Sequence, residues 1–325
     1  MRPAVSVILL TTLIGAAQGL FLALFTVQAH VFVGMLAQPP TLARFLVIGS
    51  VLGVVLLIVG LLASFFHLGR PERAWRAASQ WRTSWLSREV IVLPAFMAIG
   101  VLYGVVHAVQ AAPAVDATLA ATLRDASLLL AVVGSVGALA LFLCTAMIYA
   151  CLRFLAEWHT PLTLINFTLM GMASGFVLAA LLASVVAPGL TDFLAGWALL
   201  LTLLAAVFRG ASLRRNARLR PRSTLQSAIG VKHPQVMQTS QGFTGSSYNT
   251  REFFHGRTAQ VVRGVKWGFV WLAFVLPALL LGFAPHAPGW LALALALQFT
   301  GLLAERWFFF AQARHPQNLY YQAAA

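Results

Sequence analysis

Charged residues are scarce in this sequence: Asp, Glu, Lys and Arg make up 9% of its 325 residues, whereas hydrophobic types make up 60%. A soluble domain normally carries about 25% charged residues, so this composition excludes a soluble protein. It indicates a polytopic membrane protein, and we expect an all-α fold in which a bundle of helices crosses the bilayer.

Cysteine is also rare, with two residues in the whole chain. Cys144 and Cys151 lie on one face of an expected helix, and two thiolates cannot supply the four ligands of an iron–sulfur cluster. We therefore expect both to be packing residues. The sequence also lacks a Walker loop, a dinucleotide fingerprint and the HExxH and GxSxG motifs. Nucleotide-driven pumps and hydrolases are therefore without support.

Two histidines leave a haem interpretation open. His30 and His107 lie near the outer ends of the first and third expected spans and could provide two axial ligands. The alternative is that both are interfacial histidines that reach water, which is where amphipathic side chains ordinarily lie in membrane proteins.

Eight apolar runs are long enough to cross ~30 Å of hydrocarbon, which takes about 20 helical residues. The sixth is the weakest, because Asp192 and Arg209 lie close together at its ends. The first begins after Arg2 like a secretory signal, but its apolar run is too long for a signal core. The expected spans lie near 5–27, 43–66, 90–111, 125–150, 162–187, 190–209, 264–284 and 287–310.

The few charges are strongly unbalanced, with 22 Lys and Arg against 8 Asp and Glu, a net charge of +14. Threading eight spans leaves only Arg44 and Arg124 on one side, so the other side receives twenty of the 22 basic residues. By the positive-inside rule this basic side and both termini are cytoplasmic. Insertion and anionic lipid headgroups explain the charge better than nucleic acid does. We expect one membrane domain, 1–325, with a basic docking loop at 210–263 and a cytoplasmic tail at 311–325.

An ionisable pair lies on the basic side, where the second span ends and the third begins. His67 and Glu89 flank a loop with three Trp and five Arg residues. An ordinary interfacial loop would explain Trp and Arg, but ionisable groups at the edges of apolar helices are costly and are usually functional. A quinone head needs a hydrogen-bond donor, a proton donor or acceptor active near neutral pH, and an apolar slot for its tail. The pair and its loop predict such a quinone site.

The same stretch contains His67-Leu68-Gly69-Arg70-Pro71, then Arg73-Ala74-Trp75, and then Arg82-Thr83-Ser84-Trp85-Leu86-Ser87-Arg88-Glu89. These runs resemble the membrane-anchor subunit of the dimethyl sulfoxide reductase family, within the wider group of polysulfide-reductase-like quinone-reactive anchors. The resemblance implies a subunit without haem or metal. Such a subunit exchanges electrons between ubiquinone or menaquinone and a four-cluster iron–sulfur subunit, which serves a catalytic subunit with molybdopterin guanine dinucleotide.

By this resemblance His67 and Glu89 are the residues that carry the quinone chemistry. The quinone pocket would comprise His67, Gly69, Arg73, Trp75, Ser87, Arg88 and Glu89. The long basic loop and the tail depart from the best-known anchors, and their mixture of aromatic residues and Arg suits a folded docking surface better than a disordered linker. The expected docking residues are Arg70, Arg82, Phe243, Tyr248, Arg251, Phe253, Phe254, Tyr320 and Tyr321.

Orientation separates two branches of the family. Because the His67 and Glu89 face is expected to be cytoplasmic, the chain resembles the anchor of the cytoplasm-facing, quinone-linked sulfite dehydrogenase more than the anchors of respiratory reductases. We expect an oxidoreductase subunit of the bacterial inner membrane whose partners carry out the substrate chemistry. Three alternatives remain: the anchor of an S-oxide or N-oxide reductase that oxidises menaquinol, a passive tether, and a transporter. The transporter is disfavoured because no expected span has a charge at its centre.

Overall fold

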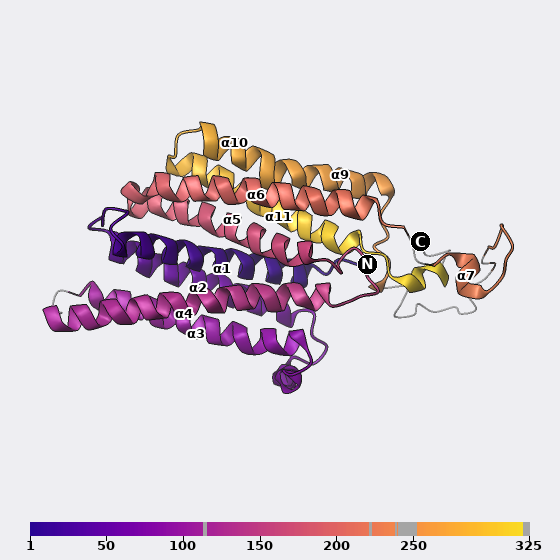
Figure 1. The fold of residues 1–325 in the computed structure, drawn as a ribbon, viewed down its shortest axis with the longest axis horizontal. Coiled ribbons are helices and arrows are strands. Elements are labelled where there is room, and N and C mark those ends of the chain that lie inside the picture. Colours follow the sequence, from indigo (N-terminus) through magenta and orange to yellow (C-terminus); the bar gives the residue numbers. More distant parts are fainter. Residues whose placement is uncertain (113–115, 221–222, 238, 240–251, 321–325) are drawn as a thin grey trace.

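The computed structural model describes residues 1–112, 116–220, 223–237, 239 and 252–320. Long helices lie side by side in one bundle (Figure 1), and the described residues contain helices, turns and loops but no strand. Eight of the described helices are long and apolar enough to cross a membrane, which confirms the predicted fold class. They are α1 (Val5–Phe32), α2 (Leu42–Phe65), α3 (Trp85–Gln110), α4 (Ala117–Ala150), α5 (Pro161–Val186), α6 (Thr191–Ala217, preceded by η2, Pro188–Leu190), the continuous helix α9–η3–α10 (Ala259–Val270, Trp271–Val275, Leu276–Phe283) and α11 (Pro288–Ala311).

Short polar side chains set several helix starts. The Ser84 hydroxyl accepts from the Ser87 backbone N–H at 3.3 Å before α3, and the Asp116 carboxylate accepts from the Leu119 N–H at 2.7 Å before α4. Such caps satisfy N–H groups that the first turn of a helix leaves unpaired. In hydrocarbon the remaining backbone groups must bond within the segment, which is why apolar runs of this length become helices.

Several helices are longer than the sequence predicted. α3 begins at Trp85 instead of 90, α4 at Ala117 instead of 125 and α9 at Ala259 instead of 264, while α1 ends at Phe32 instead of 27 and α6 at Ala217 instead of 209. The predicted ends of α3, α4, α6 and α9 were wrong because charged residues were taken as boundaries. Arg209, for example, is inside α6 and is buried against a carboxylate from another helix. Helix therefore occupies both ends of the segment 210–263.

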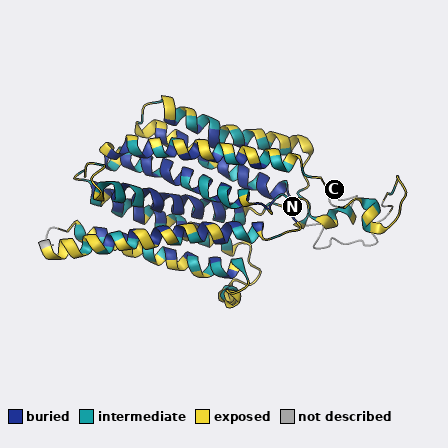
Figure 2. Cartoon of the chain, in the orientation of Figure 1, coloured by how far each residue is buried: buried dark blue, intermediate teal, exposed yellow. Residues whose placement is uncertain are grey.

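The centre of the bundle is α1. It packs against α2, α4, α5 and α11, and it is largely buried, whereas α2 and α3 expose more of their apolar surface. Figure 2 shows buried residues along the middle of the bundle and exposed residues along the outward faces of α4 and α10. Apolar side chains that remain exposed on outer helices, such as Val132 and Val136 of α4, are those expected to face lipid.

The contact between α1 and α5 depends on glycine. A Cβ atom added at Gly175 would collide with the backbone of Gly19 and Leu20. Small residues at such positions allow helix backbones in membranes to approach closely.

We therefore expect Gly175→Ala to destabilise the protein by about 1–3 kcal/mol, the usual cost of overpacking. Thermal unfolding in detergent measures this loss. Gly196→Ala is the matched control, because nothing lies within 4 Å of a Cβ at that helical position. Equal melting temperatures for the two variants would contradict this account of the α1–α5 contact.

The predicted site and docking segments lie at one end of the bundle. In Figure 1, η1 (Pro71–Gln80) lies below the right half of the bundle, next to the start of α3, and the N-terminus, α7 (Leu225–Ile229) and η4 (Pro316–Tyr320) lie at the right-hand end. The loop between α4 and α5 lies there as well. We call it the basic end, because in the eight-span arrangement the Lys and Arg excess falls on this side.

Candidate functional site

His67 lies just beyond α2, in the turn at the basic end. Its backbone N–H donates to the Ser64 carbonyl at 3.3 Å, and its side chain is exposed. Partial burial lowers the pKa of His67 below its usual value, which favours the neutral ring, the form that can both donate and accept a hydrogen bond.

The predicted neighbours of His67 lie on the same exposed loop. Gly69, Arg70, Arg73 and Trp75 are all solvent-exposed, and Arg73 forms only an exposed pair with Glu72 at 3.9 Å. Exposed pairs of this kind contribute little to stability. These cationic and aromatic groups are therefore open to a partner surface or to lipid headgroups.

Arg88, also predicted for the quinone pocket, makes contacts within its own loop. Its guanidinium lies 4.2 Å from the centre of the Trp85 ring and donates to the carbonyls of Trp81 and Arg82 at 2.9 and 2.8 Å. Arg88 thus ties the loop to the first turn of α3. Arg82 packs over Trp81 at 5.3 Å and stays exposed.

Ser87 and Glu89 point into the bundle. Glu89 is only 9% exposed, and the Thr145 hydroxyl of α4 donates to its Oε1 at 2.5 Å. Because α3 begins at Trp85, Glu89 lies one turn inside the helix, not at its edge as the sequence predicted. No hydrogen bond or ion pair links Glu89 to His67, although the structure describes both side chains.

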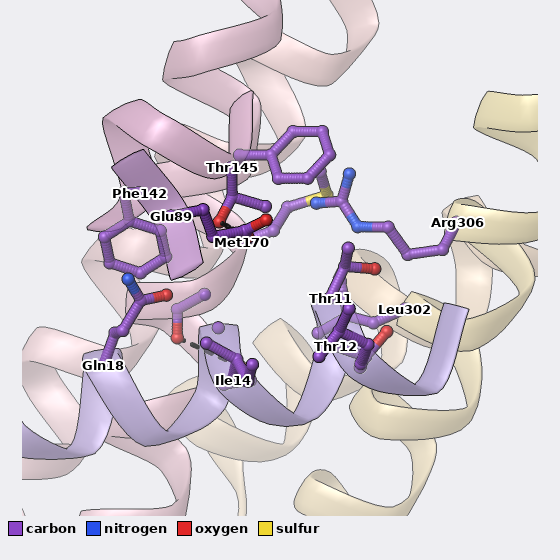
Figure 3. Close-up of a pocket in the computed structure, with 15 residues that line it drawn as sticks. Thr11, Thr12, Ile14, Gln18, Glu89, Phe142, Thr145, Met170, Leu302 and Arg306 are labelled. Carbon is purple, nitrogen blue, oxygen red and sulfur yellow. Dashed lines mark hydrogen bonds between the residues drawn. The ribbon is translucent and has the colours of Figure 1, made fainter. Parts of the chain in front are cut away.

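Glu89 lines a cavity of about 20 Å³ near the basic end. Figure 3 shows Glu89 and Thr145 on one wall, with Arg306 of α11 reaching toward them from another. The remaining lining comes from α1, α4, α5 and α11 and includes the polar side chains of Thr11, Thr12, Gln18 and Ser174.

Behind Arg306 lies a buried ionic cluster that the sequence did not predict. Glu305 binds Arg209 of α6 at 2.7 Å and the neighbouring Arg306 at 3.5 Å, and all three are almost fully buried. The Arg306 guanidinium also lies 3.7 Å from the centre of the Phe167 ring. The available signal was the adjacent pair Glu305-Arg306 inside an apolar span, since ionisable residues there are rare and usually functional.

Several of the predicted docking residues that the structure describes belong to a folded surface at the basic end. The Phe253 ring stacks on His315 at 3.7 Å, the Asn318 amide donates to the Phe253 carbonyl at 3.2 Å, and the Tyr320 hydroxyl donates to the Ala228 carbonyl at 3.2 Å. Phe254 is half-buried. Phe243, Tyr248, Arg251 and Tyr321 lie outside the described residues.

The remaining residues singled out in the sequence are the two histidines considered as haem ligands and the two cysteines. The His30 ring packs against Phe193 and the His107 ring against Tyr103, at centroid distances of 4.9 and 4.5 Å. Within the described ranges, no group of three or more His, Cys, Asp or Glu residues could hold a metal ion. Cys144 is buried, whereas Cys151 is exposed at the end of α4, so its prediction as a packing residue was wrong.

Comparison with known proteins places this arrangement in a family. Residues 1–311 match the model of the DMSO reductase anchor subunit (DmsC). The chain is also 53% identical over 330 residues to a sulfite dehydrogenase subunit of Allochromatium vinosum, with 100% of each chain covered. The predicted resemblance to this family is confirmed.

Proposed function

This chain belongs to the family of DMSO reductase anchor subunits, and we propose that it is the quinone-reactive anchor of a sulfite-oxidising complex in the bacterial inner membrane. The observation that carries the quinone assignment is the buried carboxyl of Glu89, placed one turn inside the end of the bundle that also carries His67. A passive tether would have no need for an ionisable group at that position, where burial is costly. Full-length similarity to a sulfite dehydrogenase subunit supports the choice of substrate.

The reaction divides between chains. On the molybdopterin partner, sulfite and water would give sulfate, two protons and two electrons. An iron–sulfur partner would carry the electrons to the membrane, where quinone takes up two electrons and two protons to become quinol. The residues of this chain supply positions for the protons: the neutral ring of His67 suits hydrogen bonding to a quinone carbonyl, and Glu89 suits proton exchange. Gly69, Arg73 and Trp75 would flank the quinone on the exposed side.

The partners would dock on the basic end, and we propose that this end is cytoplasmic. The exposed residues Arg70, Arg82 and Tyr320 lie there, and Arg and Tyr are enriched in protein interfaces. Even without the basic loop and its flanking Arg209 and Lys266, the Lys and Arg excess on this side is nine to two. That excess favours a cytoplasmic location under the positive-inside rule.

The complex purified in mild detergent should reduce a quinone analogue when it is given sulfite, and should show much lower activity with quinol plus dimethyl sulfoxide. Reporter fusions at Leu225 and after Ala325 should read cytoplasmic, and a fusion after Ala112 should read periplasmic. The second candidate, an S-oxide reductase anchor that oxidises menaquinol, is favoured by the family model itself. Sulfoxide reduction without sulfite oxidation, or a periplasmic reading at Leu225, would select that candidate.

A further inference from the structure

The side chain of Arg306 has a donor with no partner. Arg306 is 4% exposed, and its Nη1 forms no hydrogen bond with any residue that the structure describes. An unpaired buried donor on a charged group costs more than about 1–3 kcal/mol, and such groups are normally satisfied by ordered water or a ligand. Arg306 lines the same cavity as Glu89, so the occupant that satisfies it would also lie beside the Glu89 carboxyl.

The cavity selects the occupant by size and by hydrogen bonding. Its volume of about 20 Å³ exceeds the ~10–15 Å³ that one water needs, and it is too small for a quinone ring. The hydroxyls of Thr11, Thr12 and Ser174 already donate to backbone carbonyls of their own helices, so their oxygens remain available as acceptors. The occupant must accept from Arg306 and donate to these oxygens and to Glu89, which is what water does.

The position of Arg306 is held from two sides. Glu305 lies 3.5 Å away and is itself fixed by Arg209 at 2.7 Å, and the Phe167 ring lies against the guanidinium. These contacts join α6, α11 and α5 and leave the guanidinium few alternative rotamers. Glu305 contacts both buried arginines, and Glu89 lines the same cavity as Arg306.

We propose that ordered water in this cavity links Arg306 to Glu89 and supplies a new proton to Glu89 after it has protonated the quinone. Arg306 is the positioning residue for this water. The inference rests on the proposed function. In each cycle the Glu89 carboxyl O–H transfers its proton to the reduced quinone. The resulting carboxylate takes up a proton from the cavity water, which receives a proton from solvent at the basic end and so remains water. The electrons come from sulfite through the partner subunits. Arg306 reaches toward Glu89 across the cavity (Figure 3), so its positive charge lies on the side of Glu89 that faces the water.

Other ionisable groups near Glu89 and Arg306 are few. α4 contributes Tyr149 and Cys144, α3 contributes Arg88, and Arg209 and Glu305 complete the set. The cavity residues of α1 and α5 are neutral. A change in pH dependence on substitution of Arg306 would therefore report mainly on the Glu89 carboxyl.

The test compares Arg306→Gln with Arg306→Lys in the intact purified complex. Arg306→Gln should lower the rate of sulfite-dependent quinone reduction about tenfold or more, because proton-transfer groups contribute about 10²–10⁴-fold. It should also move the alkaline limb of the pH–rate profile up by about one pH unit, because the opposite charge near Glu89 is lost. Arg306→Lys should restore most of the rate. Electron transfer from sulfite to an artificial dye, which bypasses quinone, should not change.

A second variant keeps the inference open to refutation if Arg306→Gln does not fold. Thr11→Val keeps the shape of the side chain and removes one acceptor from the cavity, and it should slow quinone reduction several-fold. Thr26→Val is the matched control on the same helix, because its hydroxyl donates to the Leu22 carbonyl and it does not line the cavity. An unchanged rate and pH profile in Arg306→Gln, or an unchanged rate in Thr11→Val, would overturn the water relay. If Glu89→Gln also kept full quinone reduction, the proposed function itself would be wrong.

Discussion

His67→Ala and Glu89→Gln should each abolish sulfite-dependent quinone reduction, with a fall of at least about 10²-fold, while the complex still assembles. The reason is that each substitution removes a group that exchanges protons or hydrogen bonds with the quinone, and proton transfer by a positioned side chain contributes about 10²–10⁴-fold. The ring of His67 is exposed, and Glu89→Gln conserves the size of the side chain, so neither change removes packing. The measurement is quinone-analogue reduction by the detergent-purified complex.

Two controls lie at the same end of the bundle. His233→Ala removes an exposed histidine whose ring forms hydrogen bonds with the backbone of Gln235, and Glu72→Gln removes an exposed carboxylate on the loop that follows His67. Both should retain quinone reduction. Reduction of an artificial dye by sulfite should persist in all four variants, because the soluble subunits remain intact. Normal quinone reduction in His67→Ala and Glu89→Gln would instead favour a passive tether.

The bundle itself was predictable because each span must satisfy its own backbone in hydrocarbon, and long apolar runs report this directly. The ends of the spans were harder to predict from the sequence. A rule that ends a helix at the first charge fails at Arg209, which is buried in an ion pair, and at Glu89, which is buried against Thr145. A hydropathy value reflects the cost of burying a charge, but it contains no information about a partner on another helix that offsets this cost.

The candidate site also has a part that the sequence predicts and a part that it does not. The short loop between α2 and α3 brings His67 and Glu89 to one end of the bundle, and its motif is the basis on which the sequence predicts both as site residues. The cavity could not be found that way, because its polar lining comes from α1, α4, α5 and α11, which are far apart in the chain. Nothing in the spacing of Thr11, Ser174 and Arg306 predicts that they share one space.

Glu305→Ala should have the largest effect on folding. It would leave Arg209 and Arg306 buried without the carboxylate that binds both, and removal of one partner from a buried ionic cluster costs about 3–5 kcal/mol. That is a large fraction of the total stability of about 5–15 kcal/mol typical of a protein domain. We expect a steep fall in the amount of protein in the membrane and in its melting temperature in detergent. Asp125→Ala is the control, because it breaks only an exposed pair with Arg124 at 3.6 Å and should cost less than about 1 kcal/mol.

A triple variant separates the stability of this cluster from its chemistry. Replacing Arg209, Glu305 and Arg306 together with Leu removes every charge from the cluster, and apolar replacement of a whole buried ionic group is often neutral or stabilising. The triple variant should therefore melt well above Glu305→Ala while its quinone reduction stays as low as that of Arg306→Gln. A triple variant that folds well and also turns over quinone at the full rate would show that the cluster serves only packing. One that melts as low as Glu305→Ala would show instead that the ionic contacts themselves hold α6 to α11.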